Sequence, residues 1–239
     1  MRYSSTDQLE EAVAAFHAAL EEQSREQFPR DWARTKVGLG DVLFQLGKRQ
    51  PGTDQLEEAV AAFRAALQVH TRESLPLSWA STQVSLGNAL FDLGSRQSGT
   101  GRIEQAILAY HAALEVLLRE HLPLDWAMAQ GNLGQALLEL EKRKPSVDLL
   151  KAAVSAFRDA LEERTRELVP LHWARTQTGL GMALFELGKR LSSTDLIEEA
   201  VTRFRAAIKE STRDRVPLDW AITQFNLGLA VHELGIQKS

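Results

Sequence analysis

The sequence predicts an all-α fold, a solenoid of five helix-turn-helix repeats of 47 residues each. Two series of residues recur at this interval without insertion or deletion: Trp32, Trp79, Trp126, Trp173 and Trp220, and Pro29, Pro76, Pro123, Pro170 and Pro217. Each period holds two amphipathic helical patterns and none of the alternation that is typical of a strand. A fixed period of this size indicates one supersecondary unit that is copied and stacked.

The first helical pattern covers Thr6 to Glu26, and we call it and its copies the B helix. Asp7 and Glu10 have the spacing of an acidic capping box at its start. Pro29 marks its boundary, because proline is tolerated in a connection or in a first helical turn but not in a helix interior. The apolar residues follow a 3.6-residue period; they are Leu9, Ala12, Val13, Phe16, Ala19 and Leu20.

The second pattern, the A helix, covers Asp31 to Leu46 and leads through a Gly- and Pro-containing turn to the next B helix at Asp54. In the fourth repeat, Glu141 replaces a glycine that the other A helices carry near their ends, so that A helix is expected to run a little further. The alternation predicts ten helices in one repeat domain over residues 1–239, with repeats near 6–46, 53–93, 100–140, 147–187 and 194–235.

Glycine recurs inside the A helix, as in Leu86-Gly87 followed by Leu90. A glycine inside a helix costs roughly 1 kcal/mol relative to alanine. Glycines that recur in register therefore need a steric reason. We expect a neighbouring helix to approach closely at each of them.

These residues resemble the tetratricopeptide repeat family. Its signature combines Leu-Gly-x-x-Tyr in the A helix with Ala-x-x-x-Phe-x-x-Ala in the B helix, and Ala12, Phe16 and Ala19 match the latter. Leu or Val stands in place of the family's Tyr, and the period is longer than usual. The resemblance covers nearly the whole chain and implies a right-handed superhelix. The long period is similar to bacterial arrays that accompany caspase-like or nucleotide-binding domains. HEAT repeats share the period but not these spacings.

Other recurring residues are interpreted as structural. The tryptophans are expected to pack in the core between an A helix and the preceding B helix. Two rows of arginines are expected to pair with carboxylates between repeats, the alternative being an anion-binding ridge. The first row lies near the end of the B helices and comprises Arg25, Arg72, Arg119, Arg166 and Arg213; the second follows the A helices and comprises Arg49, Arg96, Arg143 and Arg190. A glutamine row is expected to form a hydrogen-bonded ladder, the alternative being capture of a peptide backbone; it comprises Gln83, Gln130, Gln177 and Gln224.

Composition excludes several functions. The net charge of −4, from 28 basic and 32 acidic residues, is too balanced for a polyanion-binding face. There is no cysteine, which fits a cytoplasmic protein, and no apolar stretch of membrane-spanning length or signal-peptide core. The histidines lack metal-ligand spacing, and no phosphate loop or nucleophile motif is present. We therefore expect no enzyme activity, cofactor, metal, nucleic acid or membrane partner.

A set of A-helix positions that vary between repeats, here called the variable stripe, is the candidate binding site. By resemblance, the matching face of tetratricopeptide repeats lines a concave groove that binds peptides or protein segments. The family's carboxylate-clamp residues are not matched, so a C-terminal carboxylate ligand is not predicted. The stripe comprises Arg34, Val37, Asp41, Ser81, Val84, Asn88, Met128, Gly131, Gln135, Arg175, Thr178, Met182, Ile222, Phe225 and Leu229.

The leading hypothesis is a non-enzymatic scaffold for a protein or peptide partner, part of a larger protein or complex. One alternative is a helical-repeat nucleic-acid reader, but two arginines among the fifteen stripe positions argue against it. A second alternative is a purely architectural spacer. The last A helix has no B helix after it, so Ile222, Phe225 and Leu229 are expected to form an apolar patch. Either the chain is cut from a longer array, or this patch forms a two-fold homodimer rather than a filament.

Overall fold

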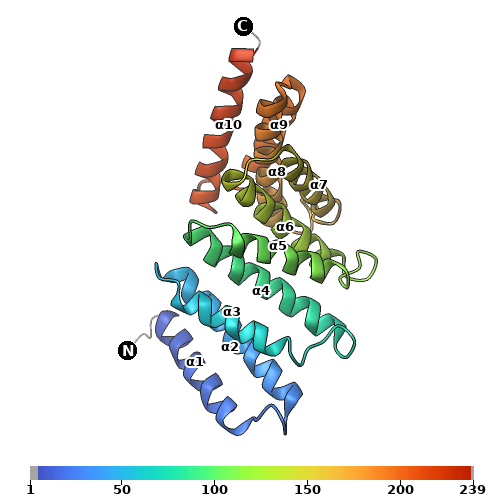
Figure 1. Ribbon diagram of the computed structural model, residues 1–239. Coiled ribbons are helices and arrows are strands. Elements are labelled where there is room, and N and C mark those ends of the chain that lie inside the picture. Colours follow the sequence, from blue (N-terminus) through green and yellow to red (C-terminus); the bar gives the residue numbers. More distant parts are fainter. Residues whose placement is uncertain (1–4, 238–239) are drawn as a thin grey trace. The chain divides into compact units, whose positions relative to one another are not determined.

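The structure is a computed structural model that describes residues 5–237, so the ends of the chain, including the first four residues of the polar N-terminal stretch, lie outside the described residues. Within this range the chain forms ten α-helices and no strand, which confirms the all-α prediction (Figure 1). The helices are α1 (Ser5–Glu22), α2 (Pro29–Arg49), α3 (Asp54–Ala66), α4 (Pro76–Arg96), α5 (Gly101–Leu114), α6 (Pro123–Arg143), α7 (Val147–Glu163), α8 (Pro170–Leu191), α9 (Thr194–Ile208) and α10 (Pro217–Gln237).

Each A helix begins at its proline, which is two residues before the start that the sequence predicted. Proline suits the first helical position because its missing N–H needs no acceptor there and its φ is already helical. The Trp32 N–H then donates to the Phe28 carbonyl at 2.9 Å, and the other four tryptophans repeat this bond. The expected extension of the A helix that carries Glu141 is wrong: this helix, α6, has 21 residues, as α2 and α4 do. It is α8 that gains one residue, before Ser192 adopts a left-handed conformation with φ 50°.

The chain divides into two compact units with the boundary between Leu117 and Leu118. The first holds α1 to α5 and the second α6 to α10, and each is described separately. Within each unit, helices that are adjacent in sequence lie side by side (Figure 1). The most extensive packing joins an A helix to the B helix that follows it, as in α2 with α3 and α8 with α9. The structural hairpins are therefore offset by one helix from the repeat boundaries drawn on the sequence.

The recurrent A-helix glycines lie against buried aromatic rings of the next B helix. A Cβ atom added to Gly181 would lie 2.6 Å from the Phe204 ring, whose side chain is completely buried. The same close approach, at 2.6–2.9 Å, recurs for Gly40 with Phe63, Gly87 with Tyr110, and Gly134 with Phe157. The expected steric reason for these glycines is thereby confirmed. Gly228 in α10, which no B helix follows, has no such neighbour within 4 Å.

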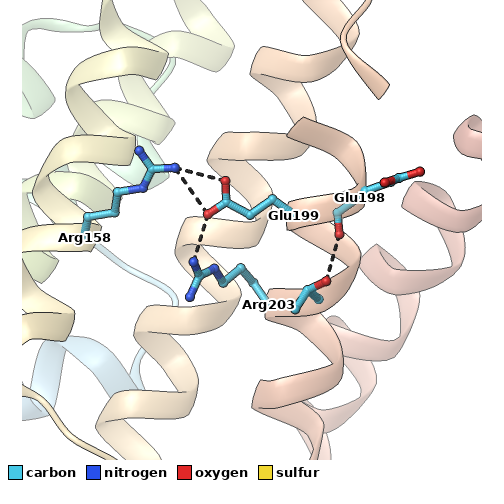
Figure 2. Close-up of polar contacts among 5 residues, drawn as sticks. Arg158, Glu198, Glu199 and Arg203 are labelled. Carbon is cyan, nitrogen blue, oxygen red and sulfur yellow. Dashed lines mark hydrogen bonds and ion pairs between the residues drawn. The ribbon is translucent and has the colours of Figure 1, made fainter. Parts of the chain in front are cut away.

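Arginines near the ends of the B helices link successive repeats through carboxylates, as the structural interpretation of that row predicted. Arg119 donates to Glu163 and Arg166 to Glu210, both at 2.6 Å, and Arg72 pairs with Glu115. These pairs are largely exposed, so each contributes about 0–1 kcal/mol. Figure 2 shows a related contact on the second unit, where Glu199 of α9 accepts hydrogen bonds from Arg158 of α7 and Arg203 of α9 at 3.0 and 2.9 Å.

In the second arginine row, Arg96 and Arg190 bind the end of the previous A helix, whereas Arg143 pairs with Glu139 of its own helix at 3.0 Å. Arg96 donates to the carbonyl oxygens of Gly47 and Gln50, both at 2.8 Å. Arg190, its copy in α8, instead donates to the side chain of Glu141 at 2.6 Å. The glutamate that interrupts the glycine series therefore supplies an acceptor at the place where the first repeat uses a backbone carbonyl.

The tryptophans are less deeply buried than the sequence indicated. All five are half-buried, whereas the aromatic residues of the B helices from α3 onward are core residues. Cationic side chains cover part of the rings: the Arg25 guanidinium lies 5.7 Å from the centroid of Trp32, and that of Arg119 lies 5.4 Å from the centroid of Trp126. The tryptophans therefore lie partly exposed at the start of each A helix and contribute less to the hydrophobic core than the sequence indicated.

Candidate functional site

In the first compact unit, the variable stripe mixes exposed and packed side chains. Arg34 is exposed and donates to Asp31 at 2.6 Å, and Ser81 is also exposed. Asp41 accepts a hydrogen bond from Ser85 at 3.4 Å, and burial raises the pKa of its carboxyl group. Val84 is only 4% exposed and therefore offers little surface to a ligand.

Two further stripe residues of this unit contribute mainly to packing. Asn88 accepts a hydrogen bond from the Tyr110 hydroxyl at 2.9 Å, and Val37 is half-buried. Tyr110 stands where the other B helices carry phenylalanine, so Asn88 satisfies the additional hydroxyl group. Burial and the nearby Asp92 carboxylate raise the pKa of Tyr110, so the phenol stays neutral and donates.

In the second compact unit, the stripe residues gather around two hollows. Met128 and Gln135 of α6 and Arg175 of α8 line a hollow of about 240 Å³. Met182 of α8 and Leu229 of α10 line another of about 290 Å³. The structure thus brings together, at two places, residues that the sequence could only assign to a face.

Thr178 differs from its stripe neighbours because its hydroxyl already has partners. It lies 3.0 Å from the Thr223 hydroxyl and donates to the Ala174 carbonyl at 3.1 Å. A half-buried hydroxyl with these bonds joins α8 to α10 and presents little free polar surface. We therefore assign Thr178 a packing role.

Sequence reasoning missed two residues of the first hollow, Arg164 and His172. Arg164 follows α7 and donates from Nη1 to Thr176 Oγ1 at 3.0 Å. Its copies in other repeats are Gln23, His70, Leu117 and Ser211. The copies of His172 are Asp31, Ser78, Asp125 and Asp219. Comparing the repeats column by column for a change of charge, rather than for identity, would have found both residues.

The glutamine ladder expected from the sequence does not form. Across residues 5–237, no hydrogen bond joins the side chains of Gln83, Gln130, Gln177 and Gln224. The amide oxygen of Gln177 is buried without a hydrogen-bond partner. The alternative role of these amides, capture of a peptide backbone, stays a prediction.

The last helix, α10, exposes much of its apolar surface. Phe225 is 67% exposed, and Ile222, Leu229 and Val231 are also exposed. Only Thr223 and Ala230 are buried among the residues of α10. The apolar patch expected from the sequence is therefore present on this helix.

Comparisons with known proteins agree on the fold. A scan of the sequence against known protein families finds no match, and a search of the curated proteins finds none. Among solved structures, BtubC (BKLC) from P. vanneervenii has a TM-score of 0.61 at 20% identity, covering 96% of this chain and 85% of that chain. MamA has a TM-score of 0.55 at 17% identity, covering 88% of this chain and 96% of its own. The chain is a helical-repeat α-solenoid. At these identities the likeness shows the fold alone.

The part of the chain that the structure describes contains neither a metal site nor a membrane-spanning helix. Between residues 5 and 237, no three histidine, aspartate or glutamate side chains converge as a metal site requires. None of the helices in that range combines the length and the apolar character needed to cross a membrane. Features that are confined to particular repeats include the two hollows lined by stripe residues and the exposed face of α10.

Proposed function

We propose that this solenoid is a non-enzymatic scaffold that binds a segment of another protein along the variable stripe. The observation that supports this most is how the repeats vary. Positions that are alike among the repeats, such as Gly134 and Gly181, lie in the core. Met128 and Gln135 differ from all their copies, and together with Arg175 they line one hollow. A repeat array provides an extended surface that suits such binding.

Reversing two stripe charges is expected to weaken binding of such a segment at least about tenfold, a loss of roughly 1.4 kcal/mol. Arg34→Glu combined with Arg175→Glu changes one exposed cation in each unit. Peptides would be selected from a random display library on the wild-type chain, and their affinities measured by fluorescence polarisation. Thermal unfolding of the variant is expected to stay unchanged, because both side chains are exposed.

The matched control carries the same charge change on B helices. Lys151→Glu with Arg205→Glu replaces two exposed cations outside the stripe and is expected to bind the selected peptides as the wild type does. Unchanged binding in the stripe variant, with loss in the control, would place the site elsewhere. If no peptide can be selected from the library, the result would favour the alternative of a purely architectural spacer. Salt-sensitive binding of an oligonucleotide would favour the nucleic-acid reader.

We further propose that the partner is bound in a bacterial cytoplasm and that the solenoid acts within a larger protein or complex. The tetratricopeptide-like signature and the long period support this setting. The absence of cysteine fits a reducing compartment. We expect the wild-type chain to capture a partner protein from a bacterial cytosol, and the Arg34→Glu, Arg175→Glu variant not to capture it.

We also propose that α10 mediates a two-fold homodimer. Its exposed face carries Ile222, Phe225 and Leu229, and Gly228 lacks the covering ring that Gly181 has. Large exposed apolar patches mark interaction sites. A self-complementary contact closes after two copies, whereas a head-to-tail contact would propagate.

Light scattering is expected to report twice the chain mass for the wild type at high concentration and the mass of one chain for Phe225→Glu with Leu229→Glu. Leu108→Glu on α5 is the control, because Leu108 is equally exposed but lies outside this face. A wild-type chain that stays monomeric at high concentration contradicts the dimer. A mass that keeps rising with concentration would indicate a filament instead.

A further inference from the structure

The first hollow of the second unit contains a guanidinium group without a counterion. Arg164 is half-buried and reaches across to α6, where a Cβ added to Gly131 would lie 2.7 Å from its Nη1. Among the described residues its hydrogen-bond partner is the neutral Thr176 hydroxyl, and no carboxylate lies within ion-pair distance. A guanidinium group has several N–H donors, so most of its hydrogen-bonding capacity is unused.

Two more basic side chains line the same hollow. The Arg175 side chain is 66% exposed. Its Nε lies 3.5 Å from Oδ2 of Asp219 in α10, which is a long distance for an ion pair. His172 lies in the first turn of α8. Burial and the Arg175 charge lower the pKa of Arg164, and burial together with both arginines lowers the pKa of His172. The hollow therefore holds positive charge that the protein neutralises only in part.

This arrangement belongs to one repeat only. Arg164 and His172 replace neutral or acidic residues of the other repeats, as described above. Gly131 is likewise unique, because its copies are Val37, Val84, Thr178 and Phe225. With any other residue at position 131, the Arg164 guanidinium would have to shift, because a Cβ there would lie 2.7 Å from its Nη1. Three separate departures from the repeat pattern thus meet around one hollow, and two of them, Arg164 and His172, introduce a basic side chain.

We infer that this hollow binds an oxyanion, a carboxylate or a phosphate group, carried by a side chain of the bound protein segment. The planar guanidinium group forms paired hydrogen bonds with such groups, and charge-assisted bonds are stronger in a partly desolvated site. The remaining wall includes Met128, which is 37% exposed and can pack against the apolar stem of the incoming side chain. The inference rests on the proposed function, since it specifies what the segment presents to the stripe.

The test uses inorganic phosphate and glutarate as separate probes on the full chain, followed by NMR of arginine and histidine side chains at low ionic strength. We expect saturable shifts of the Arg164 and Arg175 signals. We also expect the pKa of His172 to rise when the probe binds, because a nearby negative charge favours the imidazolium form. Tighter binding of inorganic phosphate would indicate that the hollow prefers a phosphate group, and tighter binding of glutarate would indicate that it prefers a carboxylate.

The decisive variant is Arg164→Leu with Thr176→Ala, which installs the residues that the third repeat carries in Leu117 and Ala129. It is expected to keep its helical signal and to bind the probes at least about tenfold more weakly. His172→Asp, which restores the acid of three other repeats, is expected to weaken binding by a similar factor. The control Arg205→Leu removes one exposed cation elsewhere and is expected to have no effect.

The outcomes separate this inference from the proposed function. One outcome would overturn the inference and leave the scaffold proposal intact. In that outcome the selected peptides bind through the stripe, but neither probe binds and Glu→Gln changes in the peptides do not weaken their binding. Probe binding that survives Arg164→Leu with Thr176→Ala would also overturn it. Probe binding by the wild type alone, with no selectable peptide, would support the oxyanion site and contradict the scaffold.

Discussion

Replacing Arg190 with methionine is expected to lower the free energy of unfolding of the second unit by about 2–3 kcal/mol. The Glu141 side chain is only 5% exposed, and Arg190 donates to it at 2.6 Å. Removing one partner of a buried ion pair leaves an uncompensated charge, which costs about 3–5 kcal/mol when both partners are fully buried. Arg190 itself is 36% exposed, so water can partly replace it and the expected loss is smaller.

The second substitution Glu141→Gly is the control for this prediction. It restores the glycine that stands at this place in the other repeats, and the backbone carbonyl of Gly47 shows that no acid is required there. Urea denaturation followed by circular dichroism is expected to show that the double variant regains most of the lost stability. Equal losses for Arg190→Met with and without Glu141→Gly would show that the ion pair is not the cause.

Much of the fold could be predicted because it depends on local and repeated chemistry. The prolines fixed where each A helix begins, since proline fits only a first turn or a connection. The glycines indicated a close helix contact, since an unexplained glycine in a helix is costly. Both inferences could be made from this one sequence, because each repeat places a proline or a glycine at the same position again.

The candidate site could be predicted only in outline. The variable stripe placed Met128, Gln135 and Arg175 on a helix face, but a helical pattern does not show which side chains of other segments approach that face. Arg164 lies outside the helices and His172 in a first turn, so neither belongs to the periodic pattern of an amphipathic helix. The depth of the tryptophans was likewise misjudged, because recurrence indicates a shared role but not how fully a side chain is covered.

Substituting alanine for Gly181 and for Gly228 is expected to have opposite effects, although both glycines occupy the same place in the repeat. At Gly181 the new methyl group would lie 2.6 Å from a completely buried Phe204 ring, and overpacking of this kind costs typically about 1–3 kcal/mol. At Gly228 nothing lies within 4 Å, so the change should only add helix propensity, a gain of up to about 1 kcal/mol. The two variants should therefore differ by about 2–3 kcal/mol in urea denaturation.

Adding Phe204→Leu to Gly181→Ala provides the internal check on that difference. A smaller side chain opposite the new methyl group should relieve the contact, so the double variant should lose less stability than the two single losses combined. Purely additive losses would mean that the ring is not what requires glycine at position 181. Equal effects of Gly181→Ala and Gly228→Ala would contradict the close approach itself. The glycines would then reflect the ancestry of the repeat rather than the space between helices.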